Sequence, residues 1–311
     1  MTGPVLAADV VEVRLGDDLP PAESPRPHLH PVRSLAGVVL SDSAPTDHPH
    51  HHGVGVAVAD LGGTNHWGGR TFVRGRGSVL RDDHGRQRVT ARRDHPDGVD
   101  LEIVWTDERG RRQGVEARRL RTCPHPAGWV LSWRTAFVPD RPLSVGSSAT
   151  NGRPGAFYGG WFWRTPFPGA VVATTAGTGV EHAHGVRSPW LLVTSDGPEA
   201  VSLLAVQRGR PRPWFVRTQG YVGFGPALAV AERLVLTPAD PLVEEVDVLV
   251  LDERLEAAAA AGLAAGLLGD PGQGRTGEPV RDHEEDQEMG TVTGTVTGTV
   301  AGGAGVTGVR S

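Results

Sequence analysis

Short segments in which apolar and polar residues alternate dominate the chain, and this is the pattern of strands with one buried face. Clusters of glycine and proline separate the segments at the spacing of antiparallel hairpins. The pattern predicts strands at 10–15, 54–58, 101–105, 129–137, 190–194, 201–206, 228–236 and 246–251. No long helical pattern alternates with them, which argues against a parallel sheet with crossover helices. We therefore expect an all-β fold, an antiparallel β-sandwich.

The end of the chain departs from this pattern. Residues 253–269 are rich in alanine and leucine, which favours a short C-terminal helix, and the Gly-Asp-Pro-Gly sequence at its end would stop it. Residues 270–311 are polar and then repeat Gly-Thr-Val, so they have too little apolar content to form a core. We expect a β-sandwich domain over 1–252, a helix over 253–269 and a disordered tail over 270–311.

The charged residues exclude several classes of function. The sequence contains no lysine, so all 31 basic residues are arginines, and this excludes a lysine Schiff base and a phosphate-binding-loop lysine. A net charge of -5 argues against general nucleic-acid binding. The arginine-rich runs at 109–112 and 118–121 are expected on solvated hairpin edges, where charge discourages edge-to-edge pairing.

Cys123 is the only cysteine, which excludes an intrachain disulfide and a cysteine-based zinc site. The first residues lack the basic start and apolar core of a signal peptide, and no stretch approaches the roughly 20 apolar residues of a membrane span. We expect a cytoplasmic protein with no membrane partner.

Histidines are concentrated at one place in the sequence. Six of the 13 lie between His28 and His52, most of them in the run Asp47-His48-Pro49-His50-His51-His52. In an extended backbone alternate side chains share a face, which would align His48, His50 and His52, whereas a turn at Pro49 would bend the run. Either the run is bent at Pro49, or only some of its histidines contribute to a common site.

Three interpretations of the histidine run stay open. Neutral imidazoles at His48, His50 and His52, with the carboxylate of Asp47, would suit a divalent metal such as iron, manganese or zinc. In a metal-free polar site the same rings would donate hydrogen bonds and act as general acids, since the imidazole pKa lies near neutrality. In a structural interpretation Pro49 imposes a turn and the imidazoles cap backbone groups.

Two further segments combine aromatic and polar groups. Asn65 and Trp67 lie in a glycine-rich stretch, where the tryptophan would either stack on a sugar ring or belong to the core. Arg153 precedes an aromatic run that ends in Trp163 and Arg164. Along that strand Trp161 and Trp163 share one face while Phe162 and Arg164 share the other, so we expect one face in the core and one lining a pocket.

The segment from Glu181 to His184 repeats the alternation, and its histidines would either join the first cluster or lie on an exposed turn. Glu181 is the carboxylate to test first as a base. The chain has no Gly-x-Ser-x-Gly nucleophile elbow. Glycoside hydrolysis requires two facing carboxylates, and the sequence does not show which of its many acidic residues would face each other. The sequence therefore does not support an ordinary hydrolase.

Several motifs together resemble the bacterial DUF6807 family, whose members also carry the labels methane oxygenase PmoA and PmoA family protein. The motifs span roughly residues 10–252 and lie at 26–32, 47–53, 65–68, 159–164, 184–190 and 213–217. Where relatives often have an arginine after the second histidine of the pair, this chain has His52. The methane label is a misnomer for this chain, because a true methane monooxygenase subunit is a membrane protein of long apolar helices.

The resemblance implies a galactose-mutarotase-like β-sandwich. Members of the family tend to be encoded near sugar oxidoreductases and sugar isomerases, and this analogy implies a carbohydrate substrate. It points to an enzyme of carbohydrate metabolism, a sugar isomerase, epimerase or lyase, acting on a sugar or oxidised glycoside by proton transfer. His50 and His51 would be the acid and the polarising group, with Glu181 as a further catalytic candidate. The substrate-binding candidates are His28, His30, Asn65, Trp67, Arg153, Trp163, Arg164 and His184.

Two other hypotheses remain. One is a metal-dependent oxygenase or lyase that uses the histidine cluster. The other is a non-catalytic sugar-binding protein that partners a sugar oxidoreductase.

Overall fold

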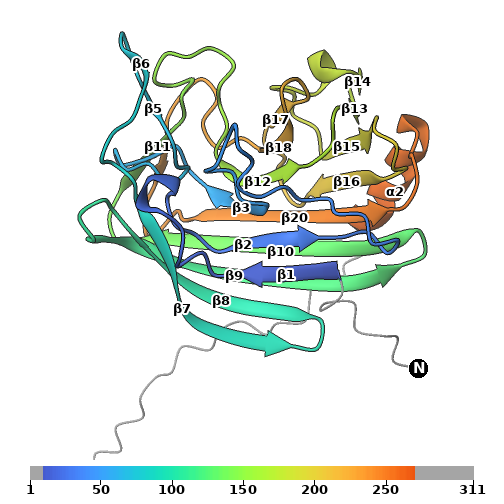
Figure 1. The fold of residues 1–311 in the computed structure, drawn as a ribbon, viewed down its shortest axis with the longest axis horizontal. Coiled ribbons are helices and arrows are strands. Elements are labelled where there is room, and N and C mark those ends of the chain that lie inside the picture. Colours follow the sequence, from blue (N-terminus) through green and yellow to red (C-terminus); the bar gives the residue numbers. More distant parts are fainter. Residues whose placement is uncertain (1–9, 270–311) are drawn as a thin grey trace, which may run out of the picture. The chain divides into compact units, whose positions relative to one another are not determined.

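The computed structural model describes residues 10–269, in which two large antiparallel sheets pack face to face (Figure 1). The smaller of the two has six strands, in the order β1-β2-β3-β12-β18-β17. These strands are β1 (Val11–Arg14), β2 (His28–Val32), β3 (Val54–Ala57), β12 (Gly160–Thr165), β18 (Val222–Pro226) and β17 (Trp214–Arg217).

The larger sheet has nine strands, in the order β14-β13-β15-β16-β20-β10-β9-β8-β7. Its strands are β7 (Arg86–His95), β8 (Gly98–Thr106), β9 (Arg112–His125), β10 (Gly128–Pro139), β13 (Ala170–Thr174), β14 (Gly177–Thr178), β15 (Trp190–Ser195), β16 (Ser202–Gln207) and β20 (Leu242–Leu251). The all-β antiparallel class predicted from the sequence is confirmed.

Smaller elements complete the fold. A three-stranded sheet has the order β19-β11-β4, and β5 and β6 form a separate hairpin. Their bounds, with those of the helices, are β4 (Asp60–Leu61), β5 (Thr71–Val73), β6 (Gly77–Val79), β11 (Leu143–Gly146), β19 (Leu234–Leu236), the 3-10 helices η1 (Pro21–Glu23) and η2 (Val180–His182), and α2 (Ala257–Gly269). No helix in the described part of the chain is long and apolar enough to cross a membrane.

Strand alternation explains how one sheet has two apolar faces. Leu203 on β16 and Val248 on β20 point into the core between the two sheets. Their neighbours Leu204 and Leu249 point the other way, into a second cluster with Ala264 of α2. Because α2 covers this outer face, β15, β16 and most of β20 are buried on both faces and read as nearly continuous apolar runs.

The predicted strands correspond to observed ones with one exception. Of the segment 228–236, only Leu234–Leu236 is a strand. Leu228 is buried, but its backbone N–H donates to the carbonyl of Gly159 outside any strand pairing, so its apolar character reflects packing of a loop. The predicted C-terminal helix is present as α2, and the predicted disordered tail lies outside the described residues.

One of the two predicted arginine-rich edges is wrong. The run at 109–112 does begin in the turn between β8 and β9, but β9 itself lies between β8 and β10. Arg118 on β9 points into the core, where it forms a 2.7 Å ion pair with Glu116 and lies 4.9 Å above the ring of Trp133. Glu116 and Arg118 are only two residues apart on β9, so their pairing is local, whereas the burial of the pair is a long-range result of the sandwich.

The six-stranded sheet positions the histidine loop, which we define as residues 41–53 between β2 and β3. Trp161 and Trp163 share one face of β12, as predicted, and this is the face that points into the core. Phe162 and Arg164 of β12 lie on the opposite face, where Phe162 contacts His51 and Arg164 contacts Tyr221. The histidine loop therefore lies against the outer face of the six-stranded sheet.

Candidate functional site

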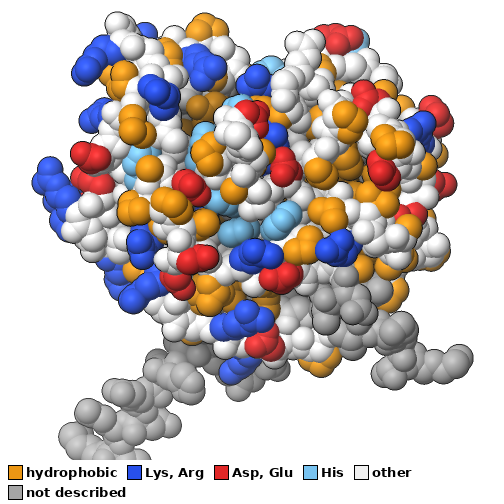
Figure 2. Space-filling view, in the orientation of Figure 1, with side chains coloured by type: hydrophobic (Ala, Val, Ile, Leu, Met, Phe, Trp, Pro, Cys, Tyr) orange, Lys and Arg blue, Asp and Glu red, His pale blue; other side chains and the backbone are white. Residues whose placement is uncertain are grey.

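The histidine loop is bent and does not form a straight strand. Residues 49 and 50 form a turn, and the backbone N–H of His51 donates to the carbonyl of His48 at 2.9 Å. The alternative in which Pro49 bends the run is therefore the one observed. The bend gathers three rings: the centroid of His51 lies 4.8 Å from that of His48 and 4.8 Å from that of His50. Histidine side chains accordingly appear near the middle of the face in Figure 2.

His52 faces away from these three rings. Its ring is 1% exposed, with Nδ1 3.3 Å from the hydroxyl of Ser43 and Nε2 3.0 Å from a carboxylate oxygen of Glu23. The ring of His28 lies 5.1 Å away, and its Nδ1 contacts the carbonyl of Arg26. His48, His50 and His52 therefore do not share a face.

A buried guanidinium holds the backbone around the histidines. Arg26 donates to the carbonyl oxygens of Glu23 at 2.7 Å, Ser24 at 3.0 Å and His50 at 2.7 Å. These bonds fix the segment before β2 against the histidine loop. They also place a positive charge beside the imidazoles.

Burial makes these imidazoles neutral at pH 7. Desolvation, followed by the charge of Arg26, lowers the pKa of His50 to about 4 and that of His52 to about 2. Desolvation also lowers the pKa of His28 to about 4 and holds the pKa of His51 well below its usual value. Neutral rings accept protons or donate a hydrogen bond, but they do not supply a proton as imidazolium.

His48 differs from the other histidines because it is paired with a carboxylate and reaches the surface. Its Nδ1 lies 2.7 Å from Asp47, and the two side chains are 31% and 55% exposed. The hydrogen bond from His48 lowers the pKa of Asp47, so this carboxylate is ionised at neutral pH. An ionised carboxylate only accepts hydrogen bonds, so Nδ1 of His48 carries the proton and Nε2 is available to react.

Aromatic rings surround His51. Its centroid lies 5.6 Å from Trp67, 5.7 Å from Phe162 and 5.2 Å from Tyr221. Trp67 continues the aromatic surface to Tyr158 at 4.5 Å. The two tyrosines of the chain thus both belong to this cluster.

Tyr221 links the aromatic surface to two arginines. The guanidinium carbons of Arg164 and Arg217 lie 4.3 Å and 4.5 Å from the centre of its ring, a cation–π geometry. Burial raises the pKa of Tyr221, so its hydroxyl is protonated at neutral pH. The ring that carries this hydroxyl lies 5.1 Å from the ring of His48 and 5.2 Å from that of His51 by centroids.

Glycine allows the 65–69 segment to approach the histidine loop. Gly68 has φ +98°, and a Cβ there would lie 2.9 Å from the Cβ of His50. Asn65 holds the same turn, since its Oδ1 accepts the backbone N–H groups of Trp67 and Gly68. Asn65 is buried and satisfied, so it positions the site instead of offering a free group.

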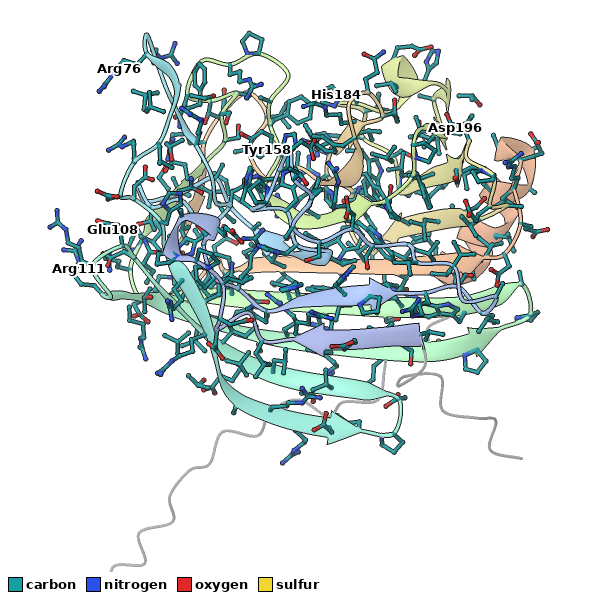
Figure 3. All side chains as sticks on the ribbon, in the orientation of Figure 1. Arg76, Glu108, Arg111, Tyr158, His184 and Asp196 are labelled. Carbon is teal, nitrogen blue, oxygen red and sulfur yellow. The ribbon has the colours of Figure 1, made fainter. Side chains whose placement is uncertain are left out.

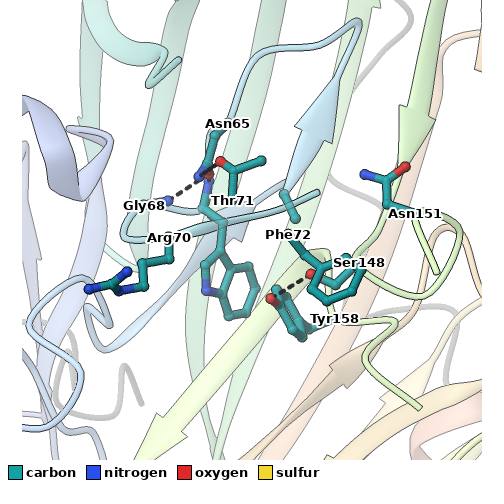
Figure 4. A pocket seen from close by; sticks show the side chains of 10 residues that line it. Asn65, Gly68, Arg70, Thr71, Phe72, Ser148, Asn151 and Tyr158 are labelled. Carbon is teal, nitrogen blue, oxygen red and sulfur yellow. Dashed lines mark hydrogen bonds between the residues drawn. The ribbon is translucent and has the colours of Figure 1, made fainter. Parts of the chain in front are cut away.

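Enclosed space at the site is small. One cavity of about 10 Å³ is lined by Arg26, His51, His52, Gly55, Ala57, Trp67 and Phe162. A second of about 10 Å³ lies on the other side of Trp67, where Ser148 and Tyr158 are hydrogen-bonded (Figure 4). Each is the size of about one water molecule, so neither holds a sugar, and His48 and Asp47 are the members of the cluster that reach the surface.

The segment at 181–184 lies apart from the histidine loop. Glu181 is 73% exposed in η2, and its ion-pair partner is His182 at 3.8 Å. The ring of His184 stacks on Phe157 at 4.3 Å and bonds to backbone groups of Gly155 and Val216. Figure 3 shows His184 and Tyr158 on neighbouring loops. Of the two alternatives left open for this segment, the contacts of Glu181 and His184 favour the one in which it does not join the first histidine cluster.

Three other sequence-based candidates also lie outside the cluster. Trp163 is fully buried, and its Nε1 donates to the carbonyl of Leu40, so it has no surface to offer a ligand. His30 contacts the hydroxyl of Ser41. Arg153 is exposed on the loop before β12.

The predicted metal ligands do not converge. Within residues 10–269, no three histidine, cysteine, aspartate or glutamate side chains are arranged to hold a metal ion. The turn at Pro49 and the pairing of His52 with Glu23 account for this, because His48 and His50 lie 5.9 Å apart by ring centroids whereas His52 is directed away from both.

Sequence reasoning missed Glu23, Ser43 and Tyr221 as members of the site. Glu23 is 29 residues from its partner His52, and Tyr221 reaches the cluster from the start of β18. The sequence contains only two tyrosines, and this scarcity is the one feature of the sequence that could have singled out Tyr221 as a candidate site residue.

Comparison with known proteins identifies a family for most of the chain. A family model described as a family of unknown function, DUF6807, matches residues 7–265. No curated protein matches. A solved structure titled as a polysaccharide lyase is similar with a TM-score of 0.36 and 12% identity, covering 78% of this chain and 32% of that one. This chain therefore spans about a third of that protein's length.

Proposed function

The chain belongs to the DUF6807 family, and from the geometry of its histidine site we propose that it is a carbohydrate-active enzyme that works by proton transfer. The pairing of His48 with Asp47 at 2.7 Å carries this proposal. A carboxylate on Nδ1 fixes the tautomer of an imidazole and stabilises the imidazolium that forms when Nε2 takes a proton.

The neighbouring groups complete the chemistry. Nε2 of His48 removes a proton from the sugar and returns it to another position of the same molecule. The neutral rings of His50 and His51 and the hydroxyl of Tyr221 donate hydrogen bonds to substrate oxygens. His50 and His51 thus keep the polarising role expected from the sequence, whereas the acid–base role moves to His48.

The aromatic surface supports a carbohydrate substrate. Trp67 and Tyr221 are buried, at 5% and 7% exposed, but they place apolar ring atoms directly beside the hydrogen-bonding groups of the histidine loop. This combination suits the mixed apolar and polar surface of a sugar. The resemblance of the sequence motifs to a family encoded near sugar enzymes implies the same class. We propose a sugar or an oxidised glycoside.

Solvent deuterium exchange tests this proposal without knowledge of the product. Pyranoses and their keto-glycosides are incubated with the protein in D₂O, and carbon-bound deuterium is followed by NMR. We expect incorporation that is lost in His48→Ala. His95→Ala is the matched control, because His95 also pairs with an aspartate, Asp100 at 3.1 Å, but lies on β7. Exchange that is absent in the wild type, or unchanged in His48→Ala, contradicts the proposal.

The same experiment separates the two other hypotheses. A non-catalytic sugar-binding protein would perturb ligand resonances without any deuterium incorporation. A metal-dependent oxygenase or lyase would contain stoichiometric metal, measured by elemental analysis of protein purified without an affinity tag, and would lose it in His50→Ala. Among residues 10–269, no group of three histidine, cysteine, aspartate or glutamate side chains supports the metal hypothesis.

A further inference from the structure

Three side chains at the edge of the histidine cluster form a continuous hydrogen-bonded chain. The hydroxyl of Ser43 lies 3.3 Å from Nδ1 of His52, and Nε2 of the same ring lies 3.0 Å from Glu23. The ring is 1% exposed, whereas the carboxylate of Glu23 is 18% exposed and Ser43 is half-buried. Water therefore does not compete for the central imidazole.

The direction of these bonds follows from the carboxylate. Burial raises the pKa of Glu23, and the charge of Arg26 opposes this shift. In its ionised form Glu23 only accepts hydrogen bonds, so Nε2 of His52 then carries the proton and Nδ1 is an acceptor. Ser43 must then donate its hydroxyl proton to Nδ1. This direction, hydroxyl to imidazole to carboxylate, is the one that activates a serine nucleophile.

The backbone around Ser43 also suits a nucleophile. Ser43 and His52 are directly opposite each other in an isolated antiparallel bridge. The flanking bonds run from Ala44 N–H to the carbonyl of His51 and from Gly53 N–H to the carbonyl of Asp42. Ser43 and His52 thus form a non-hydrogen-bonded pair, in which side chains are close and the N–H of Ser43 is left out of the pairing.

Ala44, the residue after Ser43, has φ +53°, in the left-handed region that alanine rarely adopts. Such strain persists only where surrounding structure imposes it, and it is common beside reactive groups. The N–H of Ser43 takes no part in the pairing with His52, so it is a candidate donor to an oxyanion formed on Ser43.

We propose that Ser43, His52 and Glu23 form a nucleophile, base and carboxylate that take the acyl group of a small carboxylic ester. The oxygen of Ser43 bonds to the ester carbonyl carbon while its proton passes to Nδ1 of His52. The carbon–oxygen bond to the alcohol then breaks, and the alcohol leaves with that proton. Water repeats the sequence on the acyl-serine and releases the acid. This activity is separate from the proton transfer proposed for His48.

The environment of His52 sets the expected rate. Arg26 lies nearby and burial keeps the ring neutral, so His52 is a weaker base than imidazole in water. Glu23 stabilises the imidazolium that forms during attack. We therefore expect slow acylation, detected as stoichiometric modification of Ser43 and not as rapid turnover.

Phenylmethanesulfonyl fluoride tests the proposal directly, because sulfonylation of an activated serine releases fluoride and leaves a stable adduct. Mass spectrometry should find one adduct, at Ser43, in the wild-type full chain. We expect no adduct in Ser43→Ala or His52→Ala, and labelling slowed by roughly 10²-fold or more in Glu23→Gln. An adduct at another residue, or equal labelling in Glu23→Gln, overturns the proposal.

A smaller acyl donor and a matched control complete the test. Para-nitrophenyl acetate should give a burst of one equivalent of nitrophenolate and a mass increase of one acetyl group at Ser43. Ser41→Ala is the control: Ser41 also contacts an imidazole, His30 at 3.0 Å, but that histidine has no carboxylate partner in the described residues. Circular dichroism establishes that each variant is folded. Absence of both adducts in the wild type rules the proposal out.

Discussion

The guanidinium of Arg26 donates a 2.7 Å hydrogen bond to the carbonyl oxygen of His50, 24 residues further along the chain. The same side chain also binds the carbonyls of Glu23 and Ser24, and Arg26 is almost fully buried. One residue thus satisfies three backbone oxygens and joins the two segments that supply most of the site.

Arg26→Gln should therefore unfold more easily than the wild type. Three carbonyls lose a charged donor inside the protein, and each unsatisfied buried group costs about 1–3 kcal/mol. We expect a loss of at least about 3 kcal/mol in the free energy of unfolding, measured by urea denaturation. Arg14→Gln is the control, because Arg14 also donates to a histidine carbonyl, that of His30, but at the surface. Equal losses in the two variants would contradict the role of Arg26.

Glu244 should make stability depend on pH. Burial raises its pKa from 4.5 to about 7, although it accepts the backbone N–H of Trp161 at 3.0 Å. Because the folded state holds this proton more tightly than the unfolded state, stability falls as pH rises from about 4.5 to 7 and then levels off. The total fall is of order 3 kcal/mol.

Denaturation at several pH values in Glu244→Gln measures this effect. The glutamine does not titrate, so the contribution of Glu244 should vanish and the variant should lose less stability than the wild type between pH 4.5 and 7. Glu245→Gln, which removes the neighbouring carboxylate paired with Arg134 at the surface, should keep the wild-type slope. A wild-type slope in Glu244→Gln would show that this carboxylate is not responsible.

The buried pair of Glu116 and Arg118 predicts a strong asymmetry between single and double substitutions. Arg118→Met leaves an unpaired carboxylate in the core and should cost about 3–5 kcal/mol. Replacing Glu116 by Leu in the same protein removes that charge and should restore much of the loss. Arg119→Met, at an exposed position of the same strand, should change stability by less than about 1 kcal/mol. A double variant as unstable as Arg118→Met would refute the explanation.

Gly68→Ala should disturb the site more than Gly75→Ala. Both glycines have positive φ, which strains an alanine by about 1–2 kcal/mol. A Cβ at Gly75 meets nothing within 4 Å, whereas one at Gly68 lies 2.6 Å from the carbonyl oxygen of Glu23 and 2.9 Å from His50. We expect a larger drop in melting temperature for Gly68→Ala, together with shifted imidazole NMR signals of His50. Unshifted signals would mean that the close approach is unimportant.

The sequence alone located several of the strands, including those around Val54, Trp129 and Val248, but not most of them. These strands could be found because their apolar residues form short local patterns that the sheets then use directly. The faces of β12 were also predictable, since strand geometry alone separates Trp163 from Arg164. The concentration of histidines correctly marked the loop that holds them.

Only the tertiary structure decided what surrounds those histidines. The turn at Pro49 directs His48 toward Tyr221 and leaves His52 between Ser43 and Glu23. Neither local periodicity nor spacing encodes such contacts, because the partners come from segments that meet only when the six-stranded sheet forms. The burial of Arg118 and the exposure of Glu181 have the same origin: which face a strand or loop presents depends on its neighbours across the fold.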